Sequence, residues 1–137
     1  MAKRFGLAKG EKLKSRKRVE DLFATGKSLG VFPLRVYFKF LPVGNEEEAA
    51  LQIGVTVSKK HFKKAADRNR IKRLLREAYR LQKEPINSFV KERNLKGLVF
   101  FIYVDKVMAR YKNIYETVTK ALLTLEKRTL QSNENPS

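Results

Sequence analysis

The sequence contains no cysteine and only one histidine, which limits the chemistry that its side chains can perform. Without cysteine, neither a disulfide scaffold nor a cysteine-based metal site can form, and a reducing compartment suits the chain. His61 has basic neighbours and no second histidine, so we interpret it as a surface residue of a cationic loop rather than a general base. Glycine-rich phosphate loops and the nucleophile elbow are missing as well. The sequence therefore does not predict an enzyme that acts alone, and it leaves open whether the protein itself binds a metal.

Long apolar runs are missing too. The longest, residues 98–104, has the length of a strand and falls far short of the roughly 18 residues needed to span a bilayer. The basic N-terminus lacks the apolar central region of a secretory signal. We therefore expect no membrane partner and a location in the cytoplasm.

Acidic residues are scarce. The 14 Asp and Glu stand against 31 Lys and Arg, which gives a formal net charge of +17 over 137 residues. A hydrophobic content of 42% and nine Phe argue for a folded chain rather than a basic disordered tail. The length suits one domain with a single core. Together these values predict a globular protein whose partner is a polyanion, and a nucleic acid is favoured.

Hydrophobic periodicity predicts an α+β domain in which helices pack on one sheet. The predicted helices cover residues 15–25, about 68–80 and 111–128. The predicted strands cover residues 31–41, 51–58 and 98–104. The chain thus divides into a basic arm over residues 1–14, a single domain over residues 15–130 and a polar tail over residues 131–137.

Local signals predict how these elements begin and end. Ser15 is expected to cap the first helix, and Gly26 to end it in the left-handed conformation. Pro33 is expected near the beginning of the first strand. Residues 44–48 are expected to form a hairpin loop between the first two strands, and residues 85–96 a polar stretch with at most a short extra helical turn.

Residues 68–80, RNRIKRLLREAYR, are the most informative segment because the predicted helix has two opposite faces. The apolar face holds Ile71, Leu74, Leu75, Ala78 and Tyr79. The basic face holds Asn69, Lys72, Arg73, Arg76 and Arg80. Glu77 is the only acid in the segment, so the cations repel one another unless an anion binds. A solvated amphipathic helix explains the apolar face but not the missing acids, and an anion-binding face is the favoured interpretation.

More cations crowd the approach to this helix. Lys63, Lys64, Arg68 and Arg70 lie near its N-terminal end, where the helix dipole disfavours each cation by roughly 0.3 to 1 kcal/mol. A phosphate held by free N–H groups and by these cations would remove the conflict.

The polar face of the first predicted strand suggests a second site. Arg35, Tyr37 and Lys39 lie in a row, and a tyrosine between two cations is typical of surfaces that stack bases and hold phosphates of a single strand. An exposed cross-strand tyrosine is the simpler alternative. Phe23 on the first helix, and Gly54, at which a ligand backbone can come close, favour a shallow groove for single-stranded RNA or DNA.

These segments resemble the protein subunit of bacterial ribonuclease P. The resemblance is carried by VSKK at residues 57–60, by RNR at the start of residues 68–80 and, less specifically, by LFATGKS at residues 22–28. It covers about residues 12–128.

Three segments depart from the family pattern. The linker HFKKAAD at residues 61–67 is one residue longer than usual and lacks a glycine. A first-helix position that is aromatic in the family is Val19 here. The segment of residues 83–96 is longer than the corresponding segment usually is in the family.

The resemblance implies the order α-β-β-β-α-β-α with a left-handed βαβ crossover (a ribosomal protein S5 domain 2-like fold), an exception to the usual right-handed rule. It also implies that an RNA subunit with its Mg²⁺ ions hydrolyses the bond between a precursor tRNA and its 5′ leader, while the protein assists binding. The residues expected to contact the RNA subunit are Lys59, Lys60, Arg68, Asn69, Arg70, Lys72, Arg73 and Arg76. Those expected to contact the leader are Val19, Phe23, Arg35, Tyr37 and Lys39. No protein partner is implied.

Two other classes of protein fit parts of the sequence. A structural ribosomal protein is equally basic, small and free of cysteine, and the RNR signature is what argues against it. A metal-dependent nuclease that acts alone would need a cluster of carboxylates or histidines, and no such cluster is evident. The favoured function is therefore an RNA-binding accessory subunit of a tRNA-maturing endoribonuclease.

Overall fold

The computed structural model describes residues 11–13, 15–43 and 50–134, and its elements follow the order α-β-β-β-α-β-α. The helices are α1 (Arg16–Thr25), α2 (Ala65–Glu92) and α3 (Tyr111–Glu134). The strands are β1 (Lys27–Val31), β2 (Leu34–Pro42), β3 (Ala50–Val57) and β4 (Leu95–Tyr103). The predicted α+β class, with helices packed on a single sheet, is confirmed.

The four strands pair in the order β1-β2-β4-β3, so β4 lies between the two strands that precede it in sequence. It is antiparallel to β2 and parallel to β3. The predicted hairpin pairing of the second strand with the first is therefore wrong, and its loop at residues 44–48 lies outside the described residues. The apolar run at residues 98–104 explains the arrangement, because a strand that is apolar on both faces suits the middle of a covered sheet.

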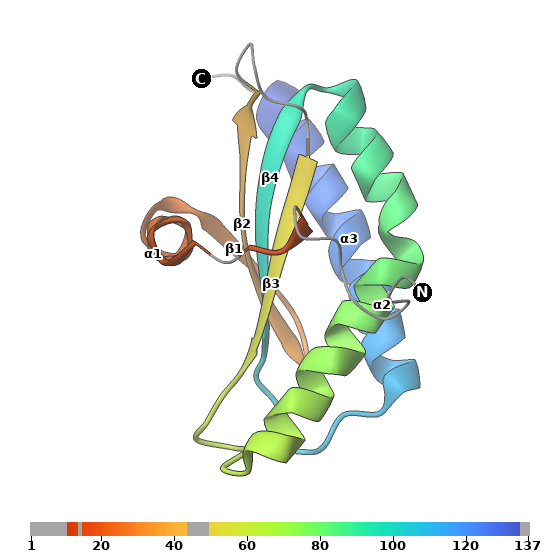
Figure 1. Ribbon diagram of the computed structural model, residues 1–137. Coiled ribbons are helices and arrows are strands. Elements are labelled where there is room, and N and C mark those ends of the chain that lie inside the picture. Colours follow the sequence, from red (N-terminus) through yellow and green to blue (C-terminus); the bar gives the residue numbers. More distant parts are fainter. Residues whose placement is uncertain (1–10, 14, 44–49, 135–137) are drawn as a thin grey trace, which may run out of the picture.

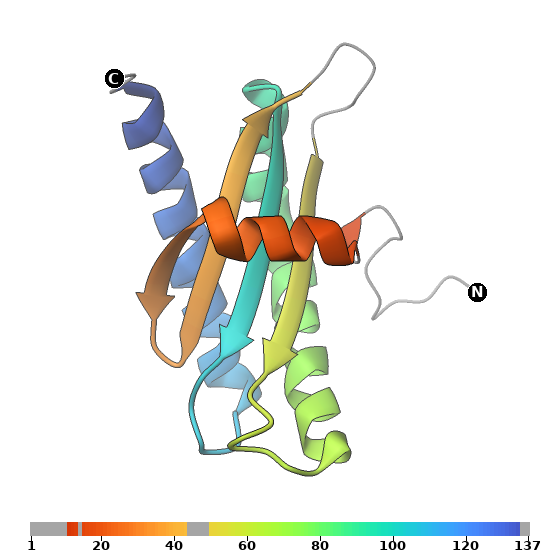
Figure 2. The ribbon, with the colours of Figure 1, turned by 90° about the vertical axis from the view of Figure 1, so that its left-hand side faces the viewer.

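The crossover between the parallel strands is left-handed. In Figure 2 the chain descends β3, rises behind the sheet in α2 and descends β4 on the left of β3. This is the rare hand for a βαβ unit, and it confirms the topology that the family resemblance implies.

Helices cover the two faces of the sheet unequally. Helices α2 and α3 lie along one face, while α1 alone crosses the other (Figures 1 and 2). On β2, Leu34, Val36 and Phe38 are buried toward the main core under α2 and α3, as the alternation predicts. A smaller core of Leu13, Leu22 and Leu98 lies under α1.

Periodicity did not locate the N-terminal edge strand, although the order that the family resemblance implies includes three strands before the second helix. The expected strand at residues 31–41 is in fact the end of β1, a turn at Phe32 and Pro33, and β2. Pro33 follows a cis peptide bond in this turn rather than beginning a strand. Leu29 is the one fully buried residue of β1, so the period-two pattern is too weak there to reveal a strand.

Helix α1 begins as predicted but ends differently. The Ser15 side chain accepts a hydrogen bond from the Arg18 N–H at 3.3 Å, which confirms the cap. Gly26 is extended (φ −78°, ψ 171°) and not left-handed, so that prediction is wrong. Its N–H donates to the Leu22 carbonyl at 2.8 Å, and a Cβ would lie 2.5 Å from the same oxygen. Glycine is needed here for close approach, because the chain passes directly into β1.

Helix α2 is far longer than the predicted residues 68–80, and the polar stretch expected at residues 85–96 is mostly helical. A break at Gln82 (φ −127°, ψ 20°) precedes Pro85, whose ring and missing N–H disturb the preceding turn. The Gln82 side chain donates to the Tyr115 carbonyl at 3.0 Å, which fixes the kink against α3. After the kink the apolar face continues, so the proline bends the helix without ending it.

The predicted domain boundaries also shift at both ends. Helix α3 continues to Glu134, beyond the expected start of the tail at residue 131. Near the other end, Lys12 forms a parallel bridge with Ile53, and the Leu13 N–H donates to the Ile53 carbonyl at 2.8 Å. The Lys83 ammonium donates to both Glu11 carboxylate oxygens, at 2.8 and 3.0 Å. The last residues of the predicted arm are therefore attached to β3 and α2.

Candidate nucleic-acid interface

Three aromatic side chains form a platform on the α1 side of the sheet: Phe23, Tyr37 and Phe100. The Phe23 ring centroid lies 4.8 Å from that of Tyr37 and 5.2 Å from that of Phe100, both in edge-on geometry. Phe23 is 43% exposed, and the other two rings are partly buried. Phe100 was not predicted as a site residue. Its position follows from its pairing with Tyr37, which the sequence does not reveal.

Gly54 serves this aromatic platform rather than a ligand. A Cβ at this position would overlap the Phe100 ring. The interpretation that the glycine lets a ligand backbone come close is therefore wrong, since the ring already occupies that space.

The other predicted leader-binding residues differ in their accessibility. Val19 is partly buried and packs with Tyr37 and Phe100 against the small core. It therefore supports the aromatic platform from α1. Arg35 is exposed and points to the same side of β2 as Tyr37, so it lies beside the platform.

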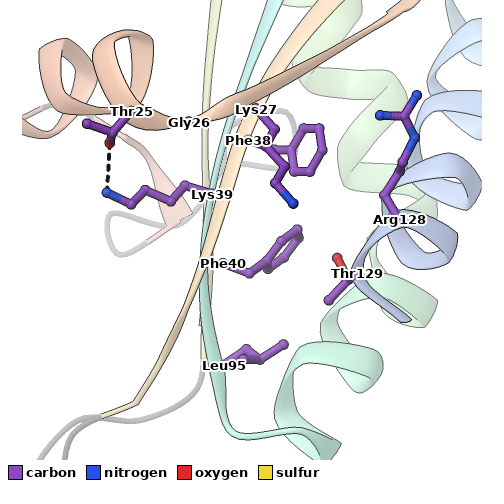
Figure 3. Close-up of a pocket in the computed structure, with 9 residues that line it drawn as sticks. All are labelled: Thr25, Gly26, Lys27, Phe38, Lys39, Phe40, Leu95, Arg128 and Thr129. Carbon is purple, nitrogen blue, oxygen red and sulfur yellow. Dashed lines mark hydrogen bonds between the residues drawn. The ribbon is translucent and has the colours of Figure 1, made fainter. Parts of the chain in front are cut away.

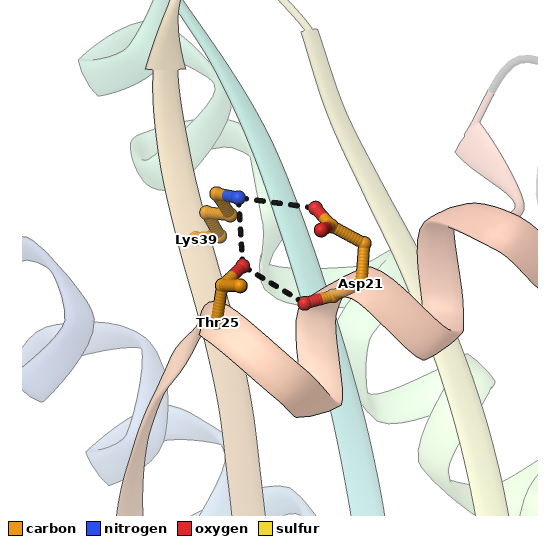
Figure 4. A network of polar contacts seen from close by, with 3 residues as sticks. All are labelled: Asp21, Thr25 and Lys39. Carbon is orange, nitrogen blue, oxygen red and sulfur yellow. Dashed lines mark hydrogen bonds and ion pairs between the residues drawn. The ribbon is translucent and has the colours of Figure 1, made fainter.

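Lys39 is engaged within the protein. Its ammonium donates to the Asp21 carboxylate at 3.0 Å and to the Thr25 hydroxyl at 2.8 Å, and that hydroxyl donates to the Asp21 carbonyl at 2.9 Å (Figure 4). At the other end of α1, Arg18 donates to Gln52 of β3 at 3.1 Å. These contacts fasten α1 across the sheet, so Lys39 positions the helix that carries Phe23.

The basic helix has the two faces that its sequence predicts. Ile71, Leu75, Ala78 and Tyr79 are buried, and Leu74 is partly buried. On the opposite side, Asn69, Arg70 and Arg73 are exposed, while Lys72 and Arg76 are partly exposed. Lys59 and Lys60 are exposed in the turn after β3. We call Lys59, Lys60, Arg70, Lys72, Arg73 and Arg76 the cationic face.

Glu77, the acid within residues 68–80, pairs with Arg80, which the sequence placed on the basic face of the helix. Arg80 donates two hydrogen bonds to the Glu77 carboxylate, both at 2.9 Å. These hydrogen bonds raise the pKa of Arg80. Within residues 11–13, 15–43 and 50–134, none of the six cations of the cationic face forms an ion pair. Their charges are available to an anionic partner.

Arg68 holds the loop that leads into α2. Its Nη1 donates to the Phe62 carbonyl at 2.7 Å and to the Lys63 carbonyl at 2.8 Å. The longer linker at residues 61–67 is thus folded against the helix, with Phe62 buried and His61 exposed. Arg68 makes no ion pair with the described residues, so a phosphate can still reach the rest of its guanidinium.

Neither a group of metal-ligating side chains nor a membrane-spanning helix is found among the described residues. No three His, Asp or Glu side chains among them come together as ligands for a metal ion. None of their helices is long and apolar enough to cross a membrane.

An aromatic platform and an unpaired cationic face on opposite layers of one sheet define an RNA-binding α+β domain. Residues 7–129 match the sequence model of the family Ribonuclease P. The ribonuclease P protein component of Porphyromonas gingivalis (strain ATCC 33277) is 37% identical over 122 residues, which is 88% of this chain and 87% of that protein. The component of Chlorobaculum tepidum is 44% identical over 78 residues, 56% of this chain and 51% of that protein.

Solved structures show the same fold. The ribonuclease P protein of Staphylococcus aureus has a TM-score of 0.62 at 22% identity, over 85% of this chain and 95% of that one. The protein from Thermotoga maritima has a TM-score of 0.60 at 24% identity, over 82% and 94%. The chain belongs to the ribonuclease P family of protein components.

Membership in this family settles the class of function. The chain is part of a ribonucleoprotein endoribonuclease of tRNA processing, and its RNA subunit is the partner that membership implies. Such nucleases typically use metal ions. A structural ribosomal protein, which composition alone allowed, is not favoured.

The two hydrogen bonds from Arg68 predict a difference between two arginines of the same helix. Arg68→Ala should lower the free energy of unfolding by about 1 to 3 kcal/mol, because two carbonyls lose a charged donor. Arg73→Ala, the matched control, should change it by less than about 0.5 kcal/mol, since Arg73 is exposed and makes no hydrogen bond among the described residues. Urea denaturation of both variants measures this difference. Equal stabilities would show that the loop does not depend on Arg68.

Proposed function

We propose that the protein binds two RNAs on opposite sides of its sheet. The aromatic platform on the α1 side binds the 5′ leader of precursor tRNA, and the cationic face of α2 binds the RNA subunit. The observation that carries this proposal is the separation of the two surfaces. Stackable rings lie on one layer, and cations without internal partners lie on the other.

The leader assignment rests on accessible rings beside a free cation. Phe23 and Tyr37 present ring surface that sequence-tolerant base stacking can use. Arg35 is exposed two residues before Tyr37 on the same face of β2, where it can contact a phosphate. Val19 and Lys39 contribute indirectly, since Val19 packs beneath the rings and Lys39 holds α1 in place.

The assignment of the RNA subunit rests on charge and shape. About two turns of α2 present Asn69, Lys72, Arg73 and Arg76 on one side. Arg70 and the turn at Lys59 and Lys60 add cations near the same end of α2. Phosphates of folded RNA suit such a row, because they fix position without requiring a particular base.

The chemistry of the assembled enzyme belongs to the RNA in this proposal. Mg²⁺ bound chiefly by the RNA subunit supplies the metal-assisted hydrolysis, and the protein binds and orients the leader. The cytoplasm is the proposed location, because the absence of cysteine suits a reducing compartment and both RNA partners are made there.

The assignment of catalysis to the RNA subunit predicts how the isolated protein behaves. Protein freed of RNA by nuclease treatment should not cleave precursor tRNA, whereas its addition to a ribonuclease P RNA at low Mg²⁺ should accelerate 5′ maturation. Gel analysis of end-labelled precursor measures both reactions. Cleavage by the RNA-free protein would overturn the proposal.

The cationic face predicts a change in salt dependence. Arg73→Ala combined with Arg76→Ala should weaken binding to the RNA subunit, and each lost phosphate contact should lower the slope of log K against log salt by about 0.7 to 0.9. Lys112→Ala with Lys127→Ala, two exposed cations of α3, is the matched control and should leave the slope nearly unchanged. Filter binding over a KCl series measures both pairs. The same slope for both pairs would mean that this face points to solvent.

Stacking on Tyr37 predicts an effect specific to the leader. Tyr37→Ala should reduce the affinity of the assembled enzyme for precursor tRNA by roughly 1 to 3 kcal/mol and barely change that for mature tRNA. Tyr37→Phe keeps the ring and should be much milder. Phe32→Ala removes a 73% exposed ring from the β1–β2 turn, away from the platform, and serves as a control. Equal losses for precursor and mature tRNA would instead make Tyr37 a packing residue.

A further inference from the structure

A hollow lies at the outer edge of β2, on the side of the sheet opposite the aromatic platform. It has a volume of about 190 Å³ and opens between β2, the start of β1 and the C-terminal part of α3 (Figure 3). Its lining residues are Thr25, Gly26, Lys27, Phe38, Lys39, Phe40, Leu95, Arg128 and Thr129. This volume is smaller than the roughly 300 to 1,000 Å³ of pockets for drug-sized ligands and suits one planar ring system.

The hollow exists because β1 begins late along β2. The first β1 residue, Lys27, pairs with Phe38, and no described strand covers the outer edge of β2 from Lys39 to Pro42. Helix α3 passes this uncovered edge without filling it (Figure 3). Among the described residues no strand pairs with the backbone groups on this side of β2, so a ligand with its own donors and acceptors can bond to them.

The lining combines an aromatic wall with cations and no acid. The Phe40 ring is partly buried, and a Cβ at Gly97 would lie 2.6 Å from it, so the ring lies close against Gly97 of β4. Lys27 and Arg128 are exposed at the rim and form no ion pair within the described part of the chain. An anion attached to a planar aromatic group matches this chemistry, and a nucleotide is such a ligand.

The hollow is continuous with the leader side of the sheet. Thr25 and Gly26, at the end of α1, line it, and Lys39 lies two residues beyond Tyr37 on the same strand. Two residues of a strand span roughly 7 Å, so the hollow begins about one short step from the aromatic platform. A single strand that leaves Tyr37 along β2 passes the end of α1, where the Lys39 ammonium contacts Asp21 and Thr25, and then turns around the edge of β2 to reach the rim.

We propose that this hollow binds one further nucleotide of the leader, with its base against Phe40 and its phosphate between Lys27 and Arg128. This inference rests on the proposed binding of the leader to the aromatic platform. It extends the contact of the protein with the leader from the α1 side of the sheet to the gap between β2 and α3.

A series of precursor tRNAs whose leaders grow by one nucleotide at a time tests the inference on the assembled enzyme. Wild-type affinity should show a further rise, beyond the one that the aromatic platform gives, at the leader length that reaches the hollow. Lys27→Ala with Arg128→Ala should lose that rise, about fivefold in affinity, and keep wild-type affinity for shorter leaders. Both residues are exposed, so the fold should survive, and melting curves check this. Lys112→Ala with Lys127→Ala is the charge-matched control and should keep the rise.

A base-directed arm separates stacking from general attraction. Phe40→Leu, which keeps an apolar side chain but removes the ring, should also lose the rise, as should an abasic nucleotide at the responding position. Retention of the full rise by the Lys27 and Arg128 variant would overturn the inference. Equal losses for all leaders and for mature tRNA would do the same, because the two cations would then act only through net charge.

The same series distinguishes this inference from the proposed function. If Tyr37→Ala discriminates precursor from mature tRNA while the Lys27 and Arg128 variant behaves as wild type, the aromatic platform stands and the hollow is not a leader site. If Tyr37→Ala shows no discrimination either, the leader assignment itself is wrong.

Discussion

Strand β4 is the constraint on which the rest of the structure depends, because it pairs along both edges and packs on both faces. Leu98 enters the small core under α1, whereas Val99 and Phe101 enter the main core under α2 and α3. A shift of one residue in its register would exchange these two sets. The register also sets Phe100 opposite Tyr37 and beside Gly54, so the aromatic platform is a consequence of how β4 is placed. The aromatic platform and the core beneath α2 and α3 therefore share one central strand.

Several of the few acidic residues form ion pairs that hold a helix or a neighbouring segment in place. Asp21 holds Lys39 and with it α1, Glu77 holds Arg80 within α2, and Glu11 holds Lys83 and with it the segment before α1. Exposed pairs of this kind contribute only about 0 to 1 kcal/mol each, so their value lies in geometry more than in stability. Glu11 also lies near the buried Tyr79 hydroxyl. Burial is the main reason that the pKa of Tyr79 is raised, and the negative charge of Glu11 raises it further. The six cations of the cationic face form no ion pair with the described residues, so their charge is available to a partner.

The sequence predicts features that repeat along the chain and misses those that depend on contacts across the sheet. Periodicity located the buried face of α2 and the alternation of β2, because burial imposes a period on neighbouring residues. It did not locate β4 between β2 and β3, since pairing order depends on contacts between distant segments. For the same reason the sequence did not reveal that Gly54 makes room for the Phe100 ring or that Lys39 pairs with Asp21. The helix was expected to end near Arg80, with at most a short helical turn in residues 85–96, because a single sequence does not show that packing against α3 keeps the chain helical beyond a kink.

The kink in α2 separates the half of the helix that carries the cationic face from the half that does not. Every α2 residue of the cationic face precedes Gln82, and the turn with Lys59 and Lys60 extends the same half. Beyond Gln82 the exposed charge is interrupted: Lys83 is paired with Glu11, and Arg93 stacks on Phe89 at 4.1 Å from its ring centroid. Gln82 itself is bonded to α3, so the first half is held at a fixed angle to the core. With the sheet between this half and α1, an RNA on the cationic face and a single strand on the aromatic platform occupy different layers. Binding of one therefore does not require displacement of the other.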